Sequence, residues 1–268
     1  MYRKSLKYII IIFFATALVT LGIKASDSLM GDDGNNNLCP SEMIFIPSSQ
    51  GGFCIDKYEV SPGKNCSVKS IENQKDSRKN LSSADCKPSS VEGVKPWIYV
   101  SQTQAREMCA RAGKRLPTNK EWLSASLGTP DKNSNWDKDD CQVAENWKDQ
   151  PGRTGSGENC ISSFGVFDMI GNVWEWTDET IEDGQFENKD LPHSGFVYEI
   201  KDDGIAMETK VKANIDYNND YFWIKNKGVR GIARGGYYSN EDEAGIYSAY
   251  LVSKPSYIGI GIGFRCVK

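Results

Sequence analysis

Alternating apolar and polar residues near the start of the chain predict two β-strands. The first covers the apolar segment 43–47, and the second covers 53–60, where apolar and polar side chains point to opposite faces. Gly51 and Gly52 between them supply the residues that a tight turn requires. The body of the protein therefore opens with two strands joined by a turn.

Two amphipathic helices are predicted in the middle of the chain. Each begins with a capping box, in which two side chains three residues apart bond the first backbone amides; the pairs are Ser101 with Gln104 and Thr118 with Glu121. Each ends at a glycine, Gly113 or Gly128. The inward-facing positions recur every three or four residues, at Ala105, Met108, Cys109, Ala112, Trp122, Leu123 and Ser126.

The remainder shows little periodicity. Segment 61–94 is polar and contains Cys66 and Cys86, so we expect a surface insertion stapled by a disulfide. Beyond Gly128, short apolar segments alternate with Gly, Asn and Asp, and the chain has 25 Gly, 12 Tyr and 7 Trp residues. This pattern predicts a turn-rich α+β domain with an aromatic core over residues 39–268.

The first 26 residues have the pattern of an export signal. Arg3, Lys4 and Lys7 precede an uncharged apolar run over 8–23, which is shorter than the roughly 20 residues of a relaxed membrane-spanning helix. Residues 1–26 are expected to be a signal peptide or an uncleaved N-terminal anchor, and 27–38 a polar linker. Either outcome exports the chain, to the periplasm, the cell surface or the medium, with membrane contact only if the segment is uncleaved.

Charge argues against a nucleic-acid partner. The 32 basic and 36 acidic residues are mixed along the chain, and no basic stripe marks an electrostatic footprint for a phosphate backbone.

Cysteine usage agrees with export. All eight cysteines lie after residue 38, and none forms a CxxC pair, which argues against a zinc or redox motif. An even number in an exported chain predicts four disulfides, although spacing leaves many pairings open. Joining neighbours in sequence suggests Cys39–Cys54, Cys66–Cys86 and Cys141–Cys160, which leaves Cys109 to pair with Cys266.

Several long motifs occur in one order along the chain: IPSSQGGFCIDKYEV near the start, AGKRLPTNKEW at 112–122, FGVFDMIGNVWEWT at 164–177, RGG at 234–236 and GFR at 263–265. In these motifs the chain resembles the formylglycine-generating-enzyme (sulfatase-modifying factor) domain family. The resemblance implies an irregular α+β variant of the C-type lectin fold with low regular content. It also implies a disulfide between Cys109 and Cys266.

The resemblance implies a copper oxidase, but its ligands are missing here. The family's active enzyme holds copper with two thiolates shortly after RGG, because soft thiolates select Cu(I). Segment 237–257 contains no cysteine, and the best-matching positions are Asn240 and Gly245. His193 is the single histidine of the chain and is expected in an exposed loop. We therefore predict no formylglycine-generating activity and neither a copper nor an iron site.

The resemblance also implies bound calcium. The corresponding positions would offer two carboxylates and two backbone carbonyls, the oxygen ligands that calcium prefers; they are Asp168, Gly171, Val173 and Glu175. The alternative is that Asp168 caps a turn while Glu175 pairs with an arginine. Arg115 and Arg234 are expected to anchor loops by bonding buried carboxylates.

A candidate binding groove follows RGG, where the active enzyme has its substrate groove. Its residues are Tyr237, Tyr238, Asn240, Tyr247 and Tyr250. An aromatic-lined surface suits a peptide or glycan, although these positions also fit ordinary strand residues that alternate between faces. Trp174 and Trp176 are expected in the core rather than in a sugar-stacking platform.

Together these observations predict a non-catalytic, calcium-stabilised, lectin-like domain that binds a peptide, a glycan or an envelope protein. Two alternatives stay open. One is an oxidoreductase of the same family whose chemistry uses carboxylates and tyrosines, and the other is a structural subunit of an envelope assembly. A deep cleft with convergent polar groups would favour the enzyme, and a shallow aromatic surface would favour binding.

Overall fold

The computed structural model describes residues 39–49 and 51–268. The predicted export segment 1–26 and linker 27–38 lie outside the described residues. Within the described part, no helix has the length and apolar character needed to cross a membrane.

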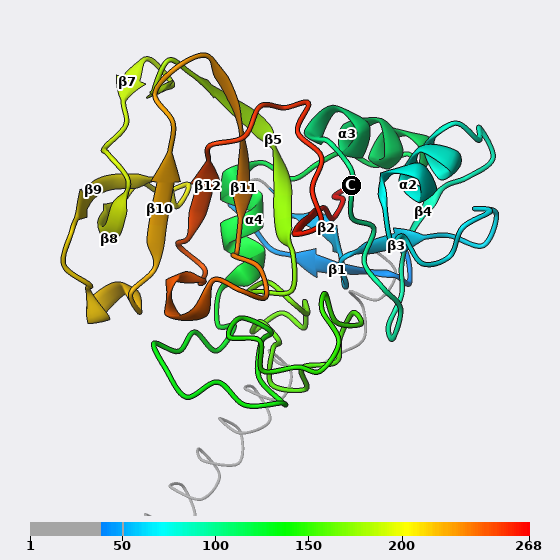
Figure 1. The fold of residues 1–268 in the computed structure, drawn as a ribbon, viewed down its shortest axis with the longest axis horizontal. Coiled ribbons are helices and arrows are strands. Elements are labelled where there is room, and N and C mark those ends of the chain that lie inside the picture. Colours follow the sequence, from blue (N-terminus) through cyan, green and yellow to red (C-terminus); the bar gives the residue numbers. More distant parts are fainter. Residues whose placement is uncertain (1–38, 50) are drawn as a thin grey trace, which may run out of the picture. The chain divides into compact units, whose positions relative to one another are not determined.

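A nine-stranded mixed sheet forms the centre of the domain, in the order β7-β6-β5-β11-β12-β10-β8-β9 with β13 beside β5 (Figure 1). Two-stranded sheets β1-β2 and β3-β4 accompany it. The strands are β1 (Met43–Ile46), β2 (Phe53–Asp56), β3 (Val60–Pro62), β4 (Pro88–Ser90), β5 (Trp174–Glu182), β6 (Gln185–Phe186), β7 (Lys189–Asp190), β8 (Gly195–Ile200), β9 (Ala206–Lys210), β10 (Tyr221–Ile224), β11 (Val229–Arg234), β12 (Ala249–Leu251) and β13 (Ile262–Gly263).

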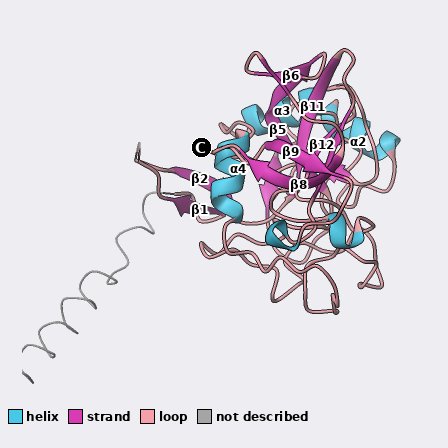
Figure 2. Ribbon diagram, turned by 90° about the vertical axis from the view of Figure 1, so that its left-hand side faces the viewer, coloured by secondary structure: helices cyan, strands magenta, loops and turns pink. Residues whose placement is uncertain are grey.

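Both predicted amphipathic helices are confirmed and pack on this sheet. They are α3 (Gln102–Arg111), which contacts β5, and α4 (Asn119–Ser126), which contacts β5 and β11. Each begins with its expected capping box, at Ser101 and Thr118. Much of the remaining chain is loop (Figure 2), and the long segment between α4 and β5 gathers at the bottom of Figure 1. The expected α+β fold with low regular content is therefore observed.

The predicted second strand, 53–60, is wrong in its extent. It divides into β2 and β3, and residues 57–59 between them bend. The backbone amide of Tyr58 donates to Ser90 Oγ (2.9 Å), and that of Val60 donates to the carbonyl of Phe264 (2.9 Å). The chain bends here because its amides bond partners on two different segments. The alternation of side chains within 53–60 gives no information about those partners.

Segment 61–94 contributes more than a surface insertion. It forms the helix α2 (Gln74–Leu81), and its Ile71 belongs to the main core. The helix was not predicted because its buried residues are polar: Ser77 accepts a hydrogen bond from Trp97 Nε1 (3.0 Å), and Asn80 bonds the backbone of Val68. No apolar stripe therefore marks it in the sequence.

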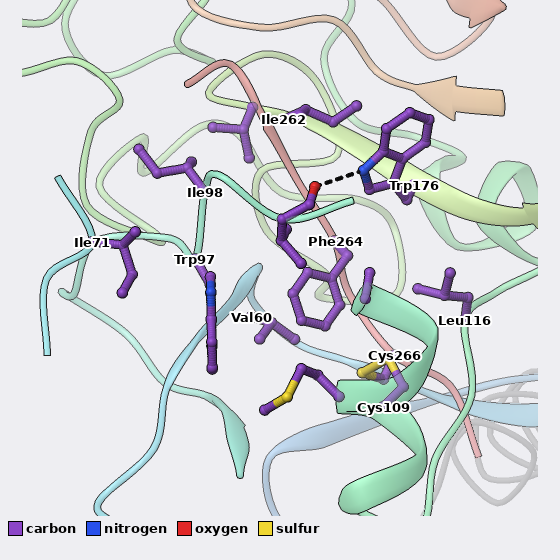
Figure 3. Packing of buried hydrophobic residues seen from close by; sticks show 14 of the residues in the cluster. Val60, Ile71, Trp97, Ile98, Cys109, Leu116, Trp176, Ile262, Phe264 and Cys266 are labelled. Atoms are coloured by element: carbon purple, nitrogen blue, oxygen red, sulfur yellow. Dashed lines mark hydrogen bonds between the residues drawn. A yellow bond between two sulfur atoms is a disulfide. The ribbon is translucent and has the colours of Figure 1, made fainter. Parts of the chain in front are cut away.

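The main core joins the helices, the sheet and the C-terminal segment (Figure 3). Trp97, Trp176 and Phe264 are fully buried, and Trp176 Nε1 donates to the carbonyl of Val100 (3.1 Å). The disulfide between Cys109 and Cys266 lies in the same core and ties α3 to the C-terminus across 157 positions. All four bonds join the cysteines expected from the sequence: Cys39–Cys54, Cys66–Cys86, Cys109–Cys266 and Cys141–Cys160.

Candidate functional site

An aromatic pocket of about 310 Å³ opens beside the central sheet. Strands β5, β10 and β12 each supply one ring, and two loops complete the wall. The lining residues are Trp174, Trp223, Tyr237, Asn240, Tyr250, Tyr257, Ile260, Gly261 and Ile262. Asn240 is the one amide among them, and no charged side chain lines the pocket.

Strand register brings the rings together. β10 and β12 run parallel, and their pairing places Trp223 directly beside Tyr250. Trp174, at the start of β5, packs against both rings, with centroid distances of 5.5 Å to Trp223 and 5.6 Å to Tyr250. Between β5 and β12, the small residue Ala233 on β11 lies opposite Tyr250. The three rings thus form one continuous aromatic wall.

The loop that follows RGG closes the pocket on another side. Asn240 Oδ1 accepts a hydrogen bond from the backbone amide of Tyr237 (2.9 Å), which holds this loop in a tight turn. Gly261 lies against the Tyr237 ring, where an added Cβ would come within 2.6 Å of a ring carbon. A larger residue at position 261 would therefore displace the ring.

The structure brings together three of the five predicted groove residues, Tyr237, Asn240 and Tyr250. Tyr238 packs edge-on against Tyr237 (4.9 Å) without lining the pocket, and Tyr247 packs against Tyr217 (5.2 Å) away from it.

Three pocket rings, those of Trp174, Trp223 and Tyr257, were not among the predicted groove residues. Trp174 is well buried, as expected for a core residue, and yet it forms part of the pocket wall. The sequence offers no sign of this, because the parallel pairing of β10 with β12 joins segments that other strands separate.

Behind the sheet, a buried arginine holds the carboxylate of Glu175. Arg265, from the GFR motif, is fully buried, and its Nε and Nη2 atoms donate to the two oxygens of Glu175 at 2.7 and 2.6 Å. Trp122 Nε1 donates to the same Glu175 Oε2 (2.7 Å). Arg265 Nη1 also donates to the carbonyl of Asp56 (3.0 Å). The closing motif therefore joins strands β2 and β5 through one guanidinium.

Two further carboxyl groups surround this pair. Glu59 and Asp168 are buried, and burial together with the negative charge of Glu175 raises the pKa of each, that of Asp168 to about 7. Asp168 Oδ2 accepts from the backbone amide of Gly155 (2.6 Å), while Asp168 Oδ1 is buried without a hydrogen-bond partner. Three carboxyl groups therefore share one guanidinium.

This cluster contains Asp168 and Glu175, two of the four positions expected to bind calcium; the other two are Gly171 and Val173. Asp168 fits the expectation, because its buried Oδ1 lacks a partner. Both oxygens of Glu175 are already bonded to Arg265, which is the arginine pairing that the alternative interpretation expects. In residues 39–49 and 51–268, no group of three or more His, Cys, Asp or Glu side chains is arranged to hold a metal ion. A calcium ion here would depend on backbone carbonyls in addition to carboxylates.

Neither Arg115 nor Arg234 bonds a fully buried carboxylate, although Arg115 bonds one that is partly buried. Arg115 pairs with Glu121 (2.6 Å) with half of its side chain exposed. Arg234 is fully buried but donates to backbone carbonyls, including that of Ile246 (3.0 Å). The arginine that bonds a buried carboxylate is Arg265, and the sequence analysis did not single it out.

Copper and iron binding would depend on the cysteines, on the positions that replace the two thiols, and on the histidine. All eight cysteines of the chain are in disulfides. Asn240 lines the pocket, and Gly245 packs against the carboxylate of Asp220. His193 is exposed, as expected.

Comparison with known proteins agrees with the motifs. The model of the family described as sulfatase-modifying factor enzyme 1-like domain matches residues 20–268. The chain is 33% identical over 99 residues to the inactive C-alpha-formylglycine-generating enzyme 2 of Bos taurus, covering 31% of this chain and 32% of that protein. It is 31% identical over 97 residues to the formylglycine-generating enzyme of Mycobacterium tuberculosis (strain ATCC 25618 / H37Rv), covering 31% and 32%. The aligned segment thus spans about a third of these relatives.

Solved structures with a related chain path include Treponema denticola variable protein 1, with a TM-score of 0.47 and 15% identity over 84% of this chain and 90% of that one. The Major Tropism Determinant M1 variant has a TM-score of 0.48 and 19% identity over 86% of this chain and 52% of that one. At this level of likeness, neither protein's function transfers to this chain.

Proposed function

The chain belongs to the sulfatase-modifying factor enzyme 1-like domain family, and we propose that it is a non-catalytic member whose aromatic pocket binds a ligand. The observation that carries the proposal is an aromatic pocket at the place where the family's oxidase has its copper-binding thiolates. Where the family's oxidase needs two thiolates after RGG, this chain has a ring-lined pocket with Asn240 as its amide. Every cysteine is in a disulfide, so no thiolate is available to hold Cu(I).

The pocket's chemistry favours a ligand with flat apolar faces. Its volume is near the lower end of the roughly 300–1,000 Å³ range of ligand sites. Aromatic side chains supply large contact area with little loss of conformational entropy, and an amide supplies a directional hydrogen bond. A sugar ring or an apolar peptide side chain meets both requirements. Two similar proteins are named inactive C-alpha-formylglycine-generating enzyme 2, which supports the proposal that this chain is also non-catalytic.

Calcium is part of this proposal as a structural ion. The side chains of Asp168 and Glu175 and the carbonyls of Gly171 and Val173 would hold it. The unpartnered Oδ1 of Asp168 supports this assignment, although Glu175 would have to keep its bonds to Arg265 while it contributes. A bound calcium would supply positive charge among buried carboxyl groups and so stabilise the fold.

Export is also part of the proposal. The domain contains four disulfides. Disulfides form and persist in oxidising compartments and are rare in the reducing cytosol. The basic and apolar pattern of residues 1–26 provides the targeting signal. The ligand is therefore expected at the cell envelope or outside the cell.

Binding is tested by screening the exported protein against glycan and peptide arrays and measuring affinity for the best ligand by tryptophan fluorescence. Trp223→Ala should weaken binding at least tenfold, because the wall of the pocket loses a ring. Tyr198→Ala is the matched control, since Tyr198 lies on β8 outside the pocket and packs on Lys210. Equal affinity of the two variants would place the ligand elsewhere.

Absence of catalysis is tested separately. The copper-treated protein is incubated with a sulfatase-type Cys-x-Pro-x-Arg peptide, and aldehyde is measured by mass spectrometry. We expect no loss of the thiol. Formation of formylglycine would overturn the non-catalytic assignment while leaving a pocket–ligand interaction intact.

A further inference from the structure

Two acidic side chains outside the pocket converge from distant parts of the chain. Asp220 directly precedes β10 and is fully buried, while Asp131 lies in the loop after α4. The backbone amide of Ile246 donates to Asp131 Oδ2 (3.0 Å), and that of the next residue, Tyr247, donates to Asp220 Oδ2 (2.7 Å). Because consecutive amides hold the two carboxylates, the carboxylates lie side by side.

Each carboxylate keeps one oxygen free. The Oδ1 atoms of Asp131 and Asp220 are both inaccessible to solvent and have no hydrogen-bond partner. The carboxylate of Asp220 occupies the space beside Gly245, where an added Cβ would lie 1.8 Å from Oδ1. A buried carboxylate oxygen without a donor is costly, so a native structure normally supplies a proton or a cation to such a group.

Nearby charges do not supply enough compensation. Burial raises the pKa of Asp131 to about 7 against the lowering effect of the Ile246 amide and the Asn218 side chain. Burial and the charge of Asp131 raise the pKa of Asp220 against the lowering effect of the Tyr247 and Ser248 amides.

Arg234 is the cation that acts on Asp220, but its Nη1 and Nη2 atoms donate to backbone carbonyls, and its Nε atom has no hydrogen-bond partner. The negative charges of Asp203 and Glu179 also act to raise the pKa of Arg234, against the lowering effect of its burial. Three carboxyl groups, those of Asp203, Asp220 and Glu179, thus act on one guanidinium, and neither Asp131 nor Asp220 has a bonded counter-ion.

We propose that Asp131 and Asp220 bind a divalent cation of calcium type through their unpartnered Oδ1 atoms. The two side-chain ligands are hard oxygens, which suit calcium rather than a metal that prefers sulfur or nitrogen. Calcium accepts backbone carbonyls and water in its remaining positions, so two carboxylates are sufficient side-chain ligands. The site is separate from Asp168 and Glu175 and does not depend on the function proposed for the pocket.

The cation would brace the pocket. Asp220 leads into β10 and Tyr247 lies just before β12, and these two strands are neighbours in the sheet (Figure 1). The strands run parallel, and their register pairs Trp223 with Tyr250. A cation on Asp220, whose carboxylate Tyr247 also bonds, fixes the starting ends of both strands. Its removal is expected to loosen the pocket wall without touching a lining residue.

The test is isothermal titration of calcium into the chelator-treated, disulfide-intact full chain. Wild type should bind one more equivalent of calcium than Asp220→Asn or Asp131→Asn. Asp216→Asn is the matched control, because Asp216 is an exposed carboxylate on the short 3-10 helix Ile215–Tyr217 just before Asp220 and should leave the stoichiometry unchanged. Asp168→Asn removes the other proposed calcium site, so the two proposals fail or hold separately.

The proposal is overturned if Asp131→Asn and Asp220→Asn bind as many equivalents as wild type. It is also overturned if both variants melt at a higher temperature than wild type, by the same amount in calcium and in chelator. That result is expected if the two aspartates share a proton and bind no cation. If the variants do not fold, the site is tested on crystals of the wild-type protein. A crystal soaked in terbium should show an anomalous peak about 2.3–2.6 Å from both Oδ1 atoms; no peak there contradicts the assignment.

Discussion

Replacing Arg265 with methionine should destabilise the protein more than any exposed charge substitution. The guanidinium is fully buried and makes two short bonds to Glu175 and one to the carbonyl of Asp56. Methionine has similar length but no donor, so Glu175 would stay buried without its counter-ion. Breaking a buried pair from one side costs about 3–5 kcal/mol. That is a large part of the roughly 5–15 kcal/mol by which such domains are stable.

Two further variants separate the charge from the shape. Glu175→Gln combined with Arg265→Met removes both charges, and we expect it to recover at least about 1 kcal/mol relative to Arg265→Met alone, since uncharged replacements of a buried pair are often tolerated. Arg115→Met is the matched control. Its partner Glu121 bonds it at 2.6 Å, but the Arg115 side chain is half exposed, and such pairs contribute about 0–1 kcal/mol.

The assay is urea unfolding at pH 7, followed by tryptophan fluorescence, with disulfides intact and a chelator present. Comparing midpoints at a common slope gives the change in the free energy of unfolding. An Arg265→Met variant that loses no more stability than Arg115→Met would refute the reasoning. So would a double variant that is no more stable than Arg265→Met alone, because removing the second charge would then have relieved nothing.

Two other predictions concern the disulfide across the core and the dependence of stability on pH. Replacing both Cys109 and Cys266 with serine opens a connection across 157 positions, and the chain-entropy estimate gives a loss of about 5 kcal/mol; thermal melting checks this, and a drop in melting temperature no larger than that for Cys39–Cys54 would contradict it. Burial raises the pKa of Glu179 to about 7. Its stabilising contribution is therefore complete below the unfolded pKa and is lost as pH rises through 7, by up to about 3 kcal/mol. Glu179→Gln should flatten the stability curve between about pH 4.5 and 7 in urea unfolding, and an unchanged slope would exclude Glu179 as its source.

Local signals in the sequence were sufficient for the elements with regular patterning. The capping boxes at Ser101 and Thr118 each begin a helix, because caps act over three residues and need no distant partner. The same local patterning did not reveal α2. Its buried face consists of Ser77 and Asn80, whose value depends on partners at Trp97 and Val68.

The aromatic pocket shows the same division. Position after RGG selected five residues, of which Tyr237, Asn240 and Tyr250 line the pocket while Tyr238 and Tyr247 do not. Trp174 and Trp223 required the strand order. Side chains on strands that are remote in sequence become neighbours only when register is set, and register depends on which faces are buried.

By itself, the sequence determined the family, the α+β class and both capped helices, and it limited the chemistry by leaving no cysteine in segment 237–257 after RGG. These properties depend on residue identity and on short-range spacing. The tertiary structure decided which charges meet. Arg265 faces Glu175 across 90 positions, and Asp131 joins Asp220 through amides that follow Gly245. Buried electrostatics depends on distances between atoms, and those distances exist only once the chain has folded.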